Sequence, residues 1–284
     1  MKISERFDFK DKPSKIILIY IILIFFCILA VFPILNTLSI ALRPADAVYV
    51  KTINPIPHGA TFANFRDAFA KYDLVRWMSN SLIVSILTTV IAVALSIGAG
   101  YAFSRFDFFG KDVGMTMLLV TQMFPAPMML LPLYIMLTKA GLSNNIFGLA
   151  IVYVSTAIPF NIWMMKGYFD TIPRSLEESA YVDGAGIFKS FYKIILPLAT
   201  PAIALTALFA FMGAWSEYIV ARVILTDNSL LTLPIGLVNM QGQFSTDWGI
   251  YSAAALMTAV PVMILFVCLS KYLVGGLTLG SVKE

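Results

Sequence analysis

Charged residues are scarce in this sequence and account for 13% of its 284 positions, about half the share found in an average soluble domain. Apolar residues account for 59%, which is more than a soluble fold can hide from water but suits the hydrocarbon core of a bilayer. The formal net charge is only +4, and no basic stripe of the kind that binds nucleic acid is present. We therefore expect an all-α membrane protein.

Histidine and cysteine are also nearly absent, which argues against metal and redox chemistry. The single histidine, His58, lies in a proline-rich polar stretch without a second ligand nearby. Cys27 and Cys268 fall in apolar segments and have no Cys-x-x-Cys partner, so we interpret them as small hydrophobic residues. The sequence also lacks a Gly-x-x-x-x-Gly-Lys-Ser/Thr run that would cradle a nucleotide phosphate. We expect no catalytic residue, no metal site and no cofactor bound by this chain.

Six long apolar segments are present, and each meets the length of about 20 residues that a helix needs to cross a membrane. Their interiors lack Lys, Arg and Asp, and Glu217 intrudes only at the end of the fifth. Prolines punctuate most of them, and we expect these prolines to kink the helices. The first segment is much longer than the apolar core of a secretory signal, so we expect it to be retained. We predict spans at residues 16–42, 77–104, 113–138, 145–165, 194–218 and 250–270, within a single transmembrane domain that covers residues 1–284.

The distribution of Lys and Arg predicts how these spans are oriented. If the N-terminus is cytoplasmic, the segments 1–15, 105–112, 166–193 and 271–284 lie inside and hold about 13 of the 20 basic residues. The outer segments then hold about 7, which agrees with the usual excess of positive charge on the cytoplasmic side. We therefore expect both termini to be cytoplasmic.

The inner segment at residues 166–193 has the pattern of a short helix and a turn. Ser175 and Glu178 have the spacing of a capping box at a helix start, and Gly184 suits the left-handed geometry of a helix end. Apolar residues then recur at helical spacing and lead into the fifth span, at Phe188, Phe191 and Ile194. We interpret three charged residues of this segment as solvated, namely Glu177, Asp183 and Lys189. Periodicity alone leaves an amphipathic helix at the membrane interface as an open alternative.

The same segment resembles a family motif. The residues Glu178-Ser179-Ala180, Gly184, Ile194 and Leu196-Pro197 resemble the cytoplasmic "EAA" loop of the permease subunits of binding-protein-dependent ATP-binding-cassette importers, with Ser179 where Ala is usual. Residues 101–106, 122–125 and 166–169 are similar to stretches of the carbohydrate branch of that family. Residues 273–278 resemble the smaller permease of maltose-type systems, and residues 215–218 are similar to a Trp-Asn-Glu motif with Ser in place of Asn.

This resemblance implies a type I importer permease with a cytoplasmic coupling helix. It implies a sister permease as heterodimer partner, two copies of a cytoplasmic ATPase that hold ATP and Mg, and an external sugar-binding protein. The ATPase-coupling residues would be Ser175, Glu178, Ser179, Ala180, Asp183, Gly184, Ile194, Leu196 and Pro197. The tail residues Gly275, Gly276, Leu277 and Thr278 would reach the ATPases, and a possible contact with the binding protein would be made by Asn239, Gln241, Gly242 and Gln243. The protein would lie in the cytoplasmic membrane of a bacterium or archaeon.

Two other functions are less consistent with the sequence. An ion-coupled carrier or channel usually has ionisable residues at mid-membrane, and an intramembrane enzyme needs a cluster of His, Asp or Glu. The span interiors lack both, and neither function explains the EAA-like segment. Glu217 either faces the transport path or lies at the interface. A maltodextrin-like sugar is the expected cargo, although the sequence does not identify which sugar.

Overall fold

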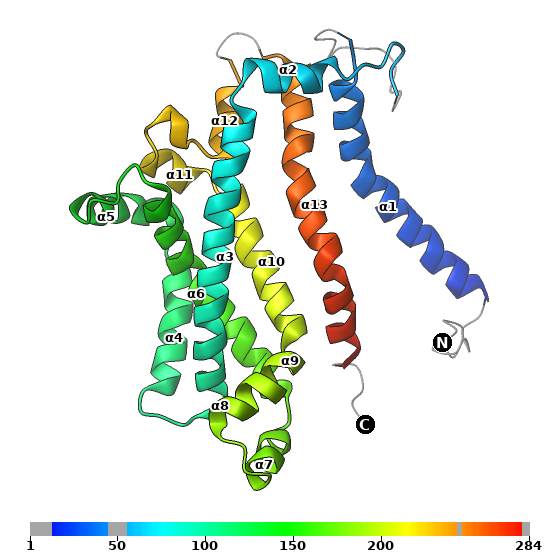
Figure 1. Ribbon diagram of the computed structural model, residues 1–284. Coiled ribbons are helices and arrows are strands. Elements are labelled where there is room, and N and C mark those ends of the chain that lie inside the picture. The colour runs from blue at the N-terminus through cyan, green and yellow to red at the C-terminus, as the bar shows by residue number, and fades with distance from the viewer. Residues whose placement is uncertain (1–12, 45–55, 243–245, 280–284) are drawn as a thin grey trace. The chain divides into compact units, whose positions relative to one another are not determined.

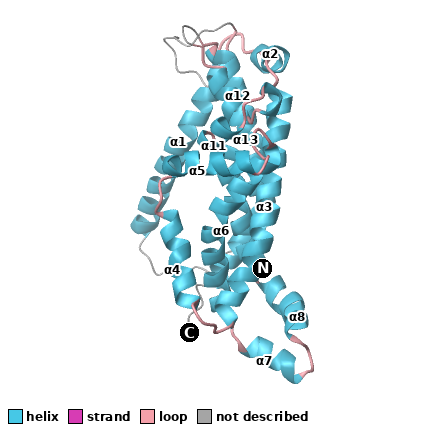
Figure 2. Cartoon of the chain, turned by 90° about the vertical axis from the view of Figure 1, so that its left-hand side faces the viewer, coloured by secondary structure: helices cyan, strands magenta, loops and turns pink. Residues whose placement is uncertain are grey.

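The computed structural model describes residues 13–44, 56–242 and 246–279 of the chain. Within these ranges the regular secondary structure is entirely helical (Figure 2). The helices are α1 (Pro13–Ala41), α2 (Ala63–Lys71), α3 (Leu74–Arg105), α4 (Lys111–Gln122), α5 (Ala126–Lys139), α6 (Ile146–Thr171), α7 (Ser175–Val182), α8 (Ile187–Ser190), α9 (Leu196–Leu198), α10 (Thr200–Ser216), α11 (Ile219–Ile224), α12 (Leu233–Asn239) and α13 (Trp248–Leu279). A π-helical turn joins α8 to α9 at Phe191–Ile195, and a 3-10 turn lies at Asn228–Leu230.

The chain divides into two compact units, formed by residues 1–72 with 241–257 and by residues 73–240 with 258–284. The first unit, as far as it is described, contains α1, α2 and the start of α13. In this unit the buried side chain of Asn64 donates hydrogen bonds to the carbonyl oxygens of Ala41 and Arg43 at 2.9 and 3.0 Å. These two bonds tie α2 to the end of α1, because they satisfy carbonyls that the helix leaves without an internal partner.

The second unit is a bundle in which α3, α6 and α10 pack against one another and α4 packs against α6 (Figure 1). Close packing of α3 and α6 depends on Gly100, because a Cβ atom there would lie 2.7 Å from Cβ of Met165. At the same level Tyr101, Phe169 and Ile195 form a buried cluster. Small residues at helix crossings are typical of membrane bundles, where they allow the backbones to approach.

Four helices are long and apolar enough to cross a membrane, at Ser14–Ala41, Leu74–Arg105, Ile146–Thr171 and Trp248–Tyr272. They correspond to the predicted spans 16–42, 77–104, 145–165 and 250–270. Prolines are present inside three of them without ending the helix, at Pro33, Pro159 and Pro261. Neighbouring groups in a membrane protein can satisfy the carbonyl that such a proline leaves free.

The other two predicted spans are not single helices, so the predicted count of six spans is not confirmed. The segment 113–138 is divided into α4 and α5 at Pro125, which has extended backbone (ψ 128°), and a residue before proline is itself disfavoured in the helical region. The segment 194–218 bends by 72° between Ile187–Leu198 and Thr200–Ser216. Pro197 and Pro201 flank this bend, and each lacks the backbone N–H that would continue the helical ladder.

Several hydroxyl groups of the second unit donate to carbonyl oxygens of their own helix. Ser79 donates to Val75, Thr138 to Tyr134 and Thr206 to Ala202, at 2.8, 2.8 and 2.7 Å. Hydroxyls in apolar helices commonly satisfy themselves in this way. Such side chains need no partner from a neighbouring helix.

Candidate functional site

Helix α7 lies at the end of the second unit opposite α12 (Figures 1 and 2). The helix ends in a Schellman motif at Gly184, whose φ is +80°. The N–H of Ala185 donates to the carbonyl of Ala180 at 2.9 Å, and the N–H of Gly184 donates to that of Tyr181 at 3.0 Å. This is the left-handed stop expected from the sequence, and glycine occupies it because a Cβ atom is disfavoured there.

The predicted capping box at the start of α7 is wrong. Ser175 is the first helical residue, and the N-cap position is occupied by Arg174, which makes no side-chain capping bond. The N–H groups of Glu177 and Glu178 donate instead to the carbonyl of Arg174, at 2.9 and 3.1 Å. Because Arg174 already has helical backbone angles, these donors find backbone partners and need no serine oxygen.

The side of α7 and α8 that faces away from the bundle is a surface of mixed character, which we name the α7 face. It exposes the polar residues Glu178, Ser179 and Asp183, and it exposes Val182 and Phe188 at 89% and 80% of their surface. Ala180, by contrast, is buried on the inner side of the helix. Large apolar side chains exposed on a protruding element are typical of surfaces that contact another protein or a membrane.

Glu177 is buried rather than solvated, which corrects the interpretation from the sequence. Its exposed fraction is 4%, and its carboxylate forms an ion pair with Arg105 at the end of α3. The hydroxyl of Tyr101 donates to the other carboxylate oxygen at 2.6 Å, and Arg105 also donates to the carbonyl of Ile172 at 2.9 Å. The buried carboxylate of Glu177 therefore joins α7 to α3, and Arg105 joins α3 to the end of α6.

A second set of polar contacts reinforces this junction. Arg174 donates to the carbonyl of Ser104 at 3.0 Å, and the hydroxyl of Ser104 donates to Asp170 at 2.7 Å. Lys166 pairs with the same Asp170 at 2.6 Å. The segment before α7 is thus held by side chains of both α3 and α6, and the α7 face rests on a rigid base.

The remaining residues predicted for ATPase coupling lie in the π-helical turn and in α9. Ile194 is partly buried against the cluster that contains Tyr101 and Phe169. Leu196 begins α9, and Pro197 follows it on the surface. Asp183 and Lys189 are exposed, as expected from the sequence.

The other predicted contact residues belong to α12, to α13 and to the segment between them. The tail residues Gly275, Gly276, Leu277 and Thr278 continue the backbone of α13. Asn239 ends α12 and is exposed, as are Gln241 and Gly242. Gln241 donates to the hydroxyl of Tyr251 at 3.0 Å, whereas Gln243 lies outside the described residues.

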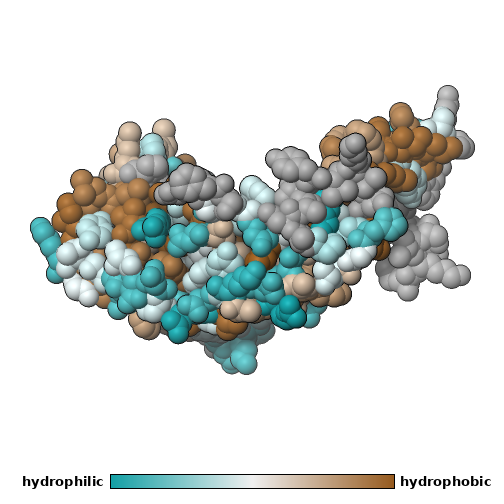
Figure 3. Space-filling view, turned by 90° about the horizontal axis from the view of Figure 1, so that it is seen from above, coloured by the Kyte–Doolittle hydropathy of each residue, from teal (hydrophilic) through white to brown (hydrophobic). Residues whose placement is uncertain are grey.

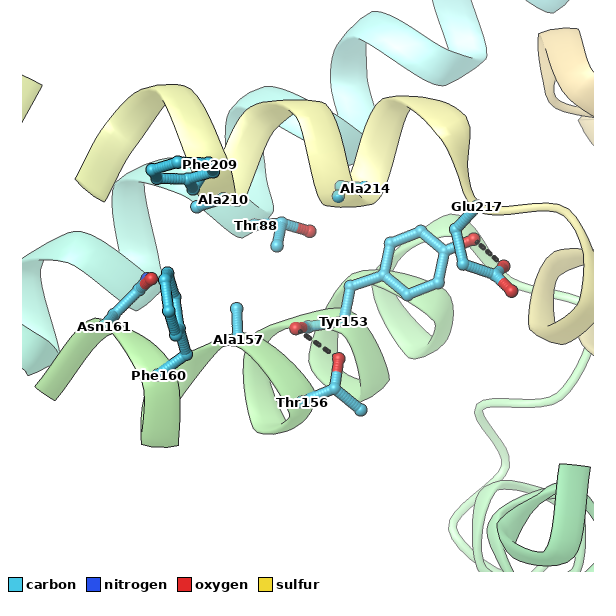
Figure 4. A pocket seen from close by; sticks show the side chains of 11 residues that line it. Thr88, Tyr153, Thr156, Ala157, Phe160, Asn161, Phe209, Ala210, Ala214 and Glu217 are labelled. Carbon is cyan, nitrogen blue, oxygen red and sulfur yellow. Dashed lines mark hydrogen bonds between the residues drawn. The ribbon is translucent and has the colours of Figure 1, made fainter. Parts of the chain in front are cut away.

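A cavity of about 230 Å³ lies between α3, α6 and α10 (Figure 4). At one end Tyr153 donates to Glu217 at 2.6 Å, and Glu217 accepts from the N–H groups of Val220 and Ala221 at 2.9 and 3.0 Å. Glu217 therefore faces the cavity and also caps the start of α11. The lining consists of Thr88, Tyr153, Thr156, Ala157, Phe160, Asn161, Phe209, Ala210, Gly213, Ala214 and Glu217.

Sequence reasoning missed the two features that the fold assembles from distant residues. Glu177 and Arg105 are separated by 72 positions, and the cavity combines three helices. A signal was present for Asn161 and Arg105, because a polar residue in or at the end of an apolar span usually has a role. In the described part of the chain, no three His, Cys, Asp or Glu residues are grouped so that they could hold a metal ion.

Long apolar helices, proline breaks and a cavity within a bundle define a multi-pass membrane protein of the transport class. Residues 91–276 match the family model described as "Binding-protein-dependent transport system inner membrane component". The chain therefore belongs to this family of transport subunits, which are not enzymes.

Individual relatives cover nearly the whole chain. The Maltodextrin transport system permease protein MalD of Streptococcus pneumoniae is 36% identical over 94% of this chain and 95% of its own length. The Galactooligosaccharides transport system permease protein GanQ of Bacillus subtilis is 33% identical, with 95% and 96% covered. A chain from the crystal structure of a bacterial ABC transporter involved in the import of the acidic polysaccharide alginate superposes with a TM-score of 0.78 at 23% identity, covering 94% of this chain and 99% of that one. The similarity to this solved structure supports the fold of the chain and nothing further.

Proposed function

We propose that this chain is one of two permease subunits of an ATP-driven importer and forms, with a sister permease, an alternating-access path for a sugar. The names of its relatives support an oligosaccharide of the maltodextrin type. The whole of residues 1–284 would act as one transmembrane domain. An ion-coupled carrier is not favoured, because the family works with a binding protein.

The α7 face carries this proposal. It presents exposed apolar and acidic side chains on a helix whose inner side is anchored by Glu177, Arg105 and Tyr101. A cytoplasmic ATPase that holds ATP and Mg would dock on this face, one copy on each permease. Nucleotide binding would favour the state in which the two ATPases approach one another, and the anchored helix would pass that displacement to α3 and α6.

The proposed function also assigns a side of the membrane to each part of the chain. The α7 face, both termini and the tail residues 275–278 would lie in the cytoplasm of a bacterium or archaeon, with the tail near the ATPases. Asn239, Gln241, Gly242 and Gln243 would lie outside, where a sugar-binding protein delivers its cargo. Hydrophilic residues gathered over the α12 end support an aqueous location for that end (Figure 3).

The docking proposal is tested with the substitution Phe188→Asp in an assembly co-expressed with the neighbouring transport genes and purified in lipid. Phe188 is 80% exposed, so the change spares the core. We expect the co-purified ATPase to fall at least tenfold, because burial of one phenylalanine contributes about 1.5–3 kcal/mol. Phe62, 75% exposed in the first unit, provides the matched control Phe62→Asp. Equal ATPase recovery from both variants would contradict docking on the α7 face.

A further inference from the structure

We propose that the cavity between α3, α6 and α10 is a sugar subsite supplied by this chain itself, and that it holds one neutral sugar ring of the cargo. The proposal rests on the proposed function as a sugar importer. It goes beyond that function, because it assigns part of the sugar contact to residues of this subunit.

Two buried polar groups of the cavity have no hydrogen-bond partner within the described part of the chain. They are the side-chain amide nitrogen of Asn161 on α6 and the hydroxyl of Thr88 on α3. Both residues are 1% exposed and line the cavity (Figure 4). An unsatisfied buried donor destabilises a fold by about 1–3 kcal/mol, so a donor of this kind that lines a cavity points to a ligand that completes the bond.

The far end of the cavity provides the apolar contact that a sugar ring also needs. Phe160 and Phe209 stand at 87° with their ring centroids 5.7 Å apart, and about half of each side chain remains exposed. In Figure 4 they lie at the end of the cavity opposite Tyr153 and Glu217. A sugar ring has flat C–H faces and a polar rim, so it can pack on an aromatic side chain while its hydroxyls reach Asn161 and Thr88.

The size of the cavity limits the occupant to a single ring. Small residues on α6 and α10 create the space, namely Ala157, Ala210, Gly213 and Ala214, and a Cβ atom added at Gly213 would meet no atom within 4 Å. The volume of about 230 Å³ is below the roughly 300–1,000 Å³ of pockets that enclose larger ligands. The other rings of an oligosaccharide would therefore extend out of this cavity.

The charge of the lining selects a neutral sugar. Glu217 is the ionisable carboxylate of the lining, and no Lys, Arg or His lines the cavity. Its oxygens already accept from Tyr153, Val220 and Ala221, so Glu217 needs no cationic ligand. An acidic sugar would place a second negative charge near this carboxylate without a compensating cation, which is unfavourable in a low-dielectric site.

The experiment measures how much labelled maltotriose the complete assembly retains when a non-hydrolysable ATP analogue holds it in one state. The variants are Asn161→Leu and Thr88→Val, which keep the side-chain size and remove the hydrogen bond. Ser96→Ala is the matched control, because Ser96 is buried on α3 and equally without a partner but does not line the cavity. We expect each cavity variant to lower the affinity for maltotriose up to about tenfold, the effect of one lost hydrogen bond, and the control to leave it unchanged.

A second readout separates a binding role from a structural one. Asn161→Leu removes an unsatisfied donor, so we expect the apparent melting temperature of the sugar-free assembly to stay the same or rise. Unchanged retention in both variants, or a lowered melting temperature, would overturn the subsite and leave the importer function standing. Retention of an oligosaccharide of uronic acids in place of maltotriose would overturn the preference for a neutral ring. If no sugar is retained by the wild-type assembly and none stimulates its ATPase with the binding protein, the proposed function itself fails.

Discussion

Glu177 and Glu178 are adjacent glutamates on α7, but the first is buried and the second is exposed. Glu177 turns toward the bundle and pairs with Arg105, whereas Glu178 faces outward. The paired side chains of Arg105 and Glu177 are only 7% and 5% exposed. Desolvation makes each charge costly by itself, so the pair depends on both members being present. The junction between α7 and the bundle therefore depends mainly on the first of the two glutamates.

Glu177→Gln should destabilise the purified chain by about 3 kcal/mol, because it leaves the Arg105 charge buried without its counter-charge. Glu178→Gln should change stability by less than about 0.5 kcal/mol, as expected for an exposed position. The double variant Arg105→Met with Glu177→Leu should recover much of the loss, because no buried charge remains. Thermal unfolding in detergent measures all three, and equal losses for the two single glutamate variants would contradict the assignment.

In α7 and the turn after it, the sequence correctly predicted the features that depend only on neighbouring residues. Gly184 was expected as a helix stop, and it is one, because a left-handed turn requires only the residue that adopts it. The exposure of Asp183 was also predicted correctly. The burial of Glu177 was not, because its partners are in α3, and the supposed cap at Ser175 failed because backbone carbonyls already satisfied the first turn. Contacts that depend on tertiary packing carry no local signal.

At the scale of the helices, the crossing of α3 and α6 is set by one face of α3. Gly100 lies against α6, where a Cβ atom would be 2.7 Å from Cβ of Met165 and 3.0 Å from the backbone nitrogen of Lys166. Gly98, two residues earlier on the same helix, has no atom within 4 Å of the corresponding position. The two glycines therefore allow the packing of this pair of helices to be tested with the same substitution.

Gly100→Ala should destabilise the chain by about 1–3 kcal/mol, because the added methyl group forces α3 and α6 apart. Gly98→Ala has room and should be neutral or stabilise the helix by up to about 1 kcal/mol. The apparent melting temperatures of the two variants, measured side by side in the same detergent, give the comparison. A lower melting temperature for Gly98→Ala than for Gly100→Ala would contradict the close approach at Gly100.

Four of the six predicted spans correspond to single helices that are long and apolar enough to cross a membrane, because a long apolar run in a membrane is most stable as a helix. The same rule failed where prolines change the path of the chain. Pro33, Pro159 and Pro261 remain inside helices, whereas Pro125 separates two of them. The outcome depends on which neighbours satisfy the freed carbonyl groups, and that information is absent from the local sequence. The cavity was not predictable for a related reason, since it exists only where three helices meet.

At the scale of the whole molecule, the two ends of the long helix α3 contact different segments of the second unit. Asn80 near its start donates to the carbonyl groups of Ser229 and Leu231, at 3.0 and 2.9 Å. Arg105 at its end pairs with Glu177. The helix has 32 residues and is therefore about 48 Å long, which exceeds the hydrocarbon thickness of about 30 Å. We therefore expect the two ends of α3 to lie in different aqueous compartments.

Single cysteines at the two ends should react with a membrane-impermeant thiol reagent from opposite sides. Val182→Cys, in a chain whose Cys27 and Cys268 are first replaced by alanine, should be labelled only in inside-out vesicles. Asn228→Cys, which is also at an exposed position, should be labelled only in intact cells. Labelling of both from one side would contradict the membrane crossing, and exchange of the two sides would invert the proposed orientation.

The hydroxyl groups that bond within their own helices also bear on how the protein is made. A transmembrane helix enters the bilayer before its neighbours are in place, so any side-chain donor it carries must be satisfied alone or face lipid. Ser79, Thr138 and Thr206 meet that condition from the start, because each acceptor lies four residues earlier on the same helix. These three hydroxyl groups therefore need no later helix to arrive, whereas Asn80 must wait for the carbonyl groups of Ser229 and Leu231.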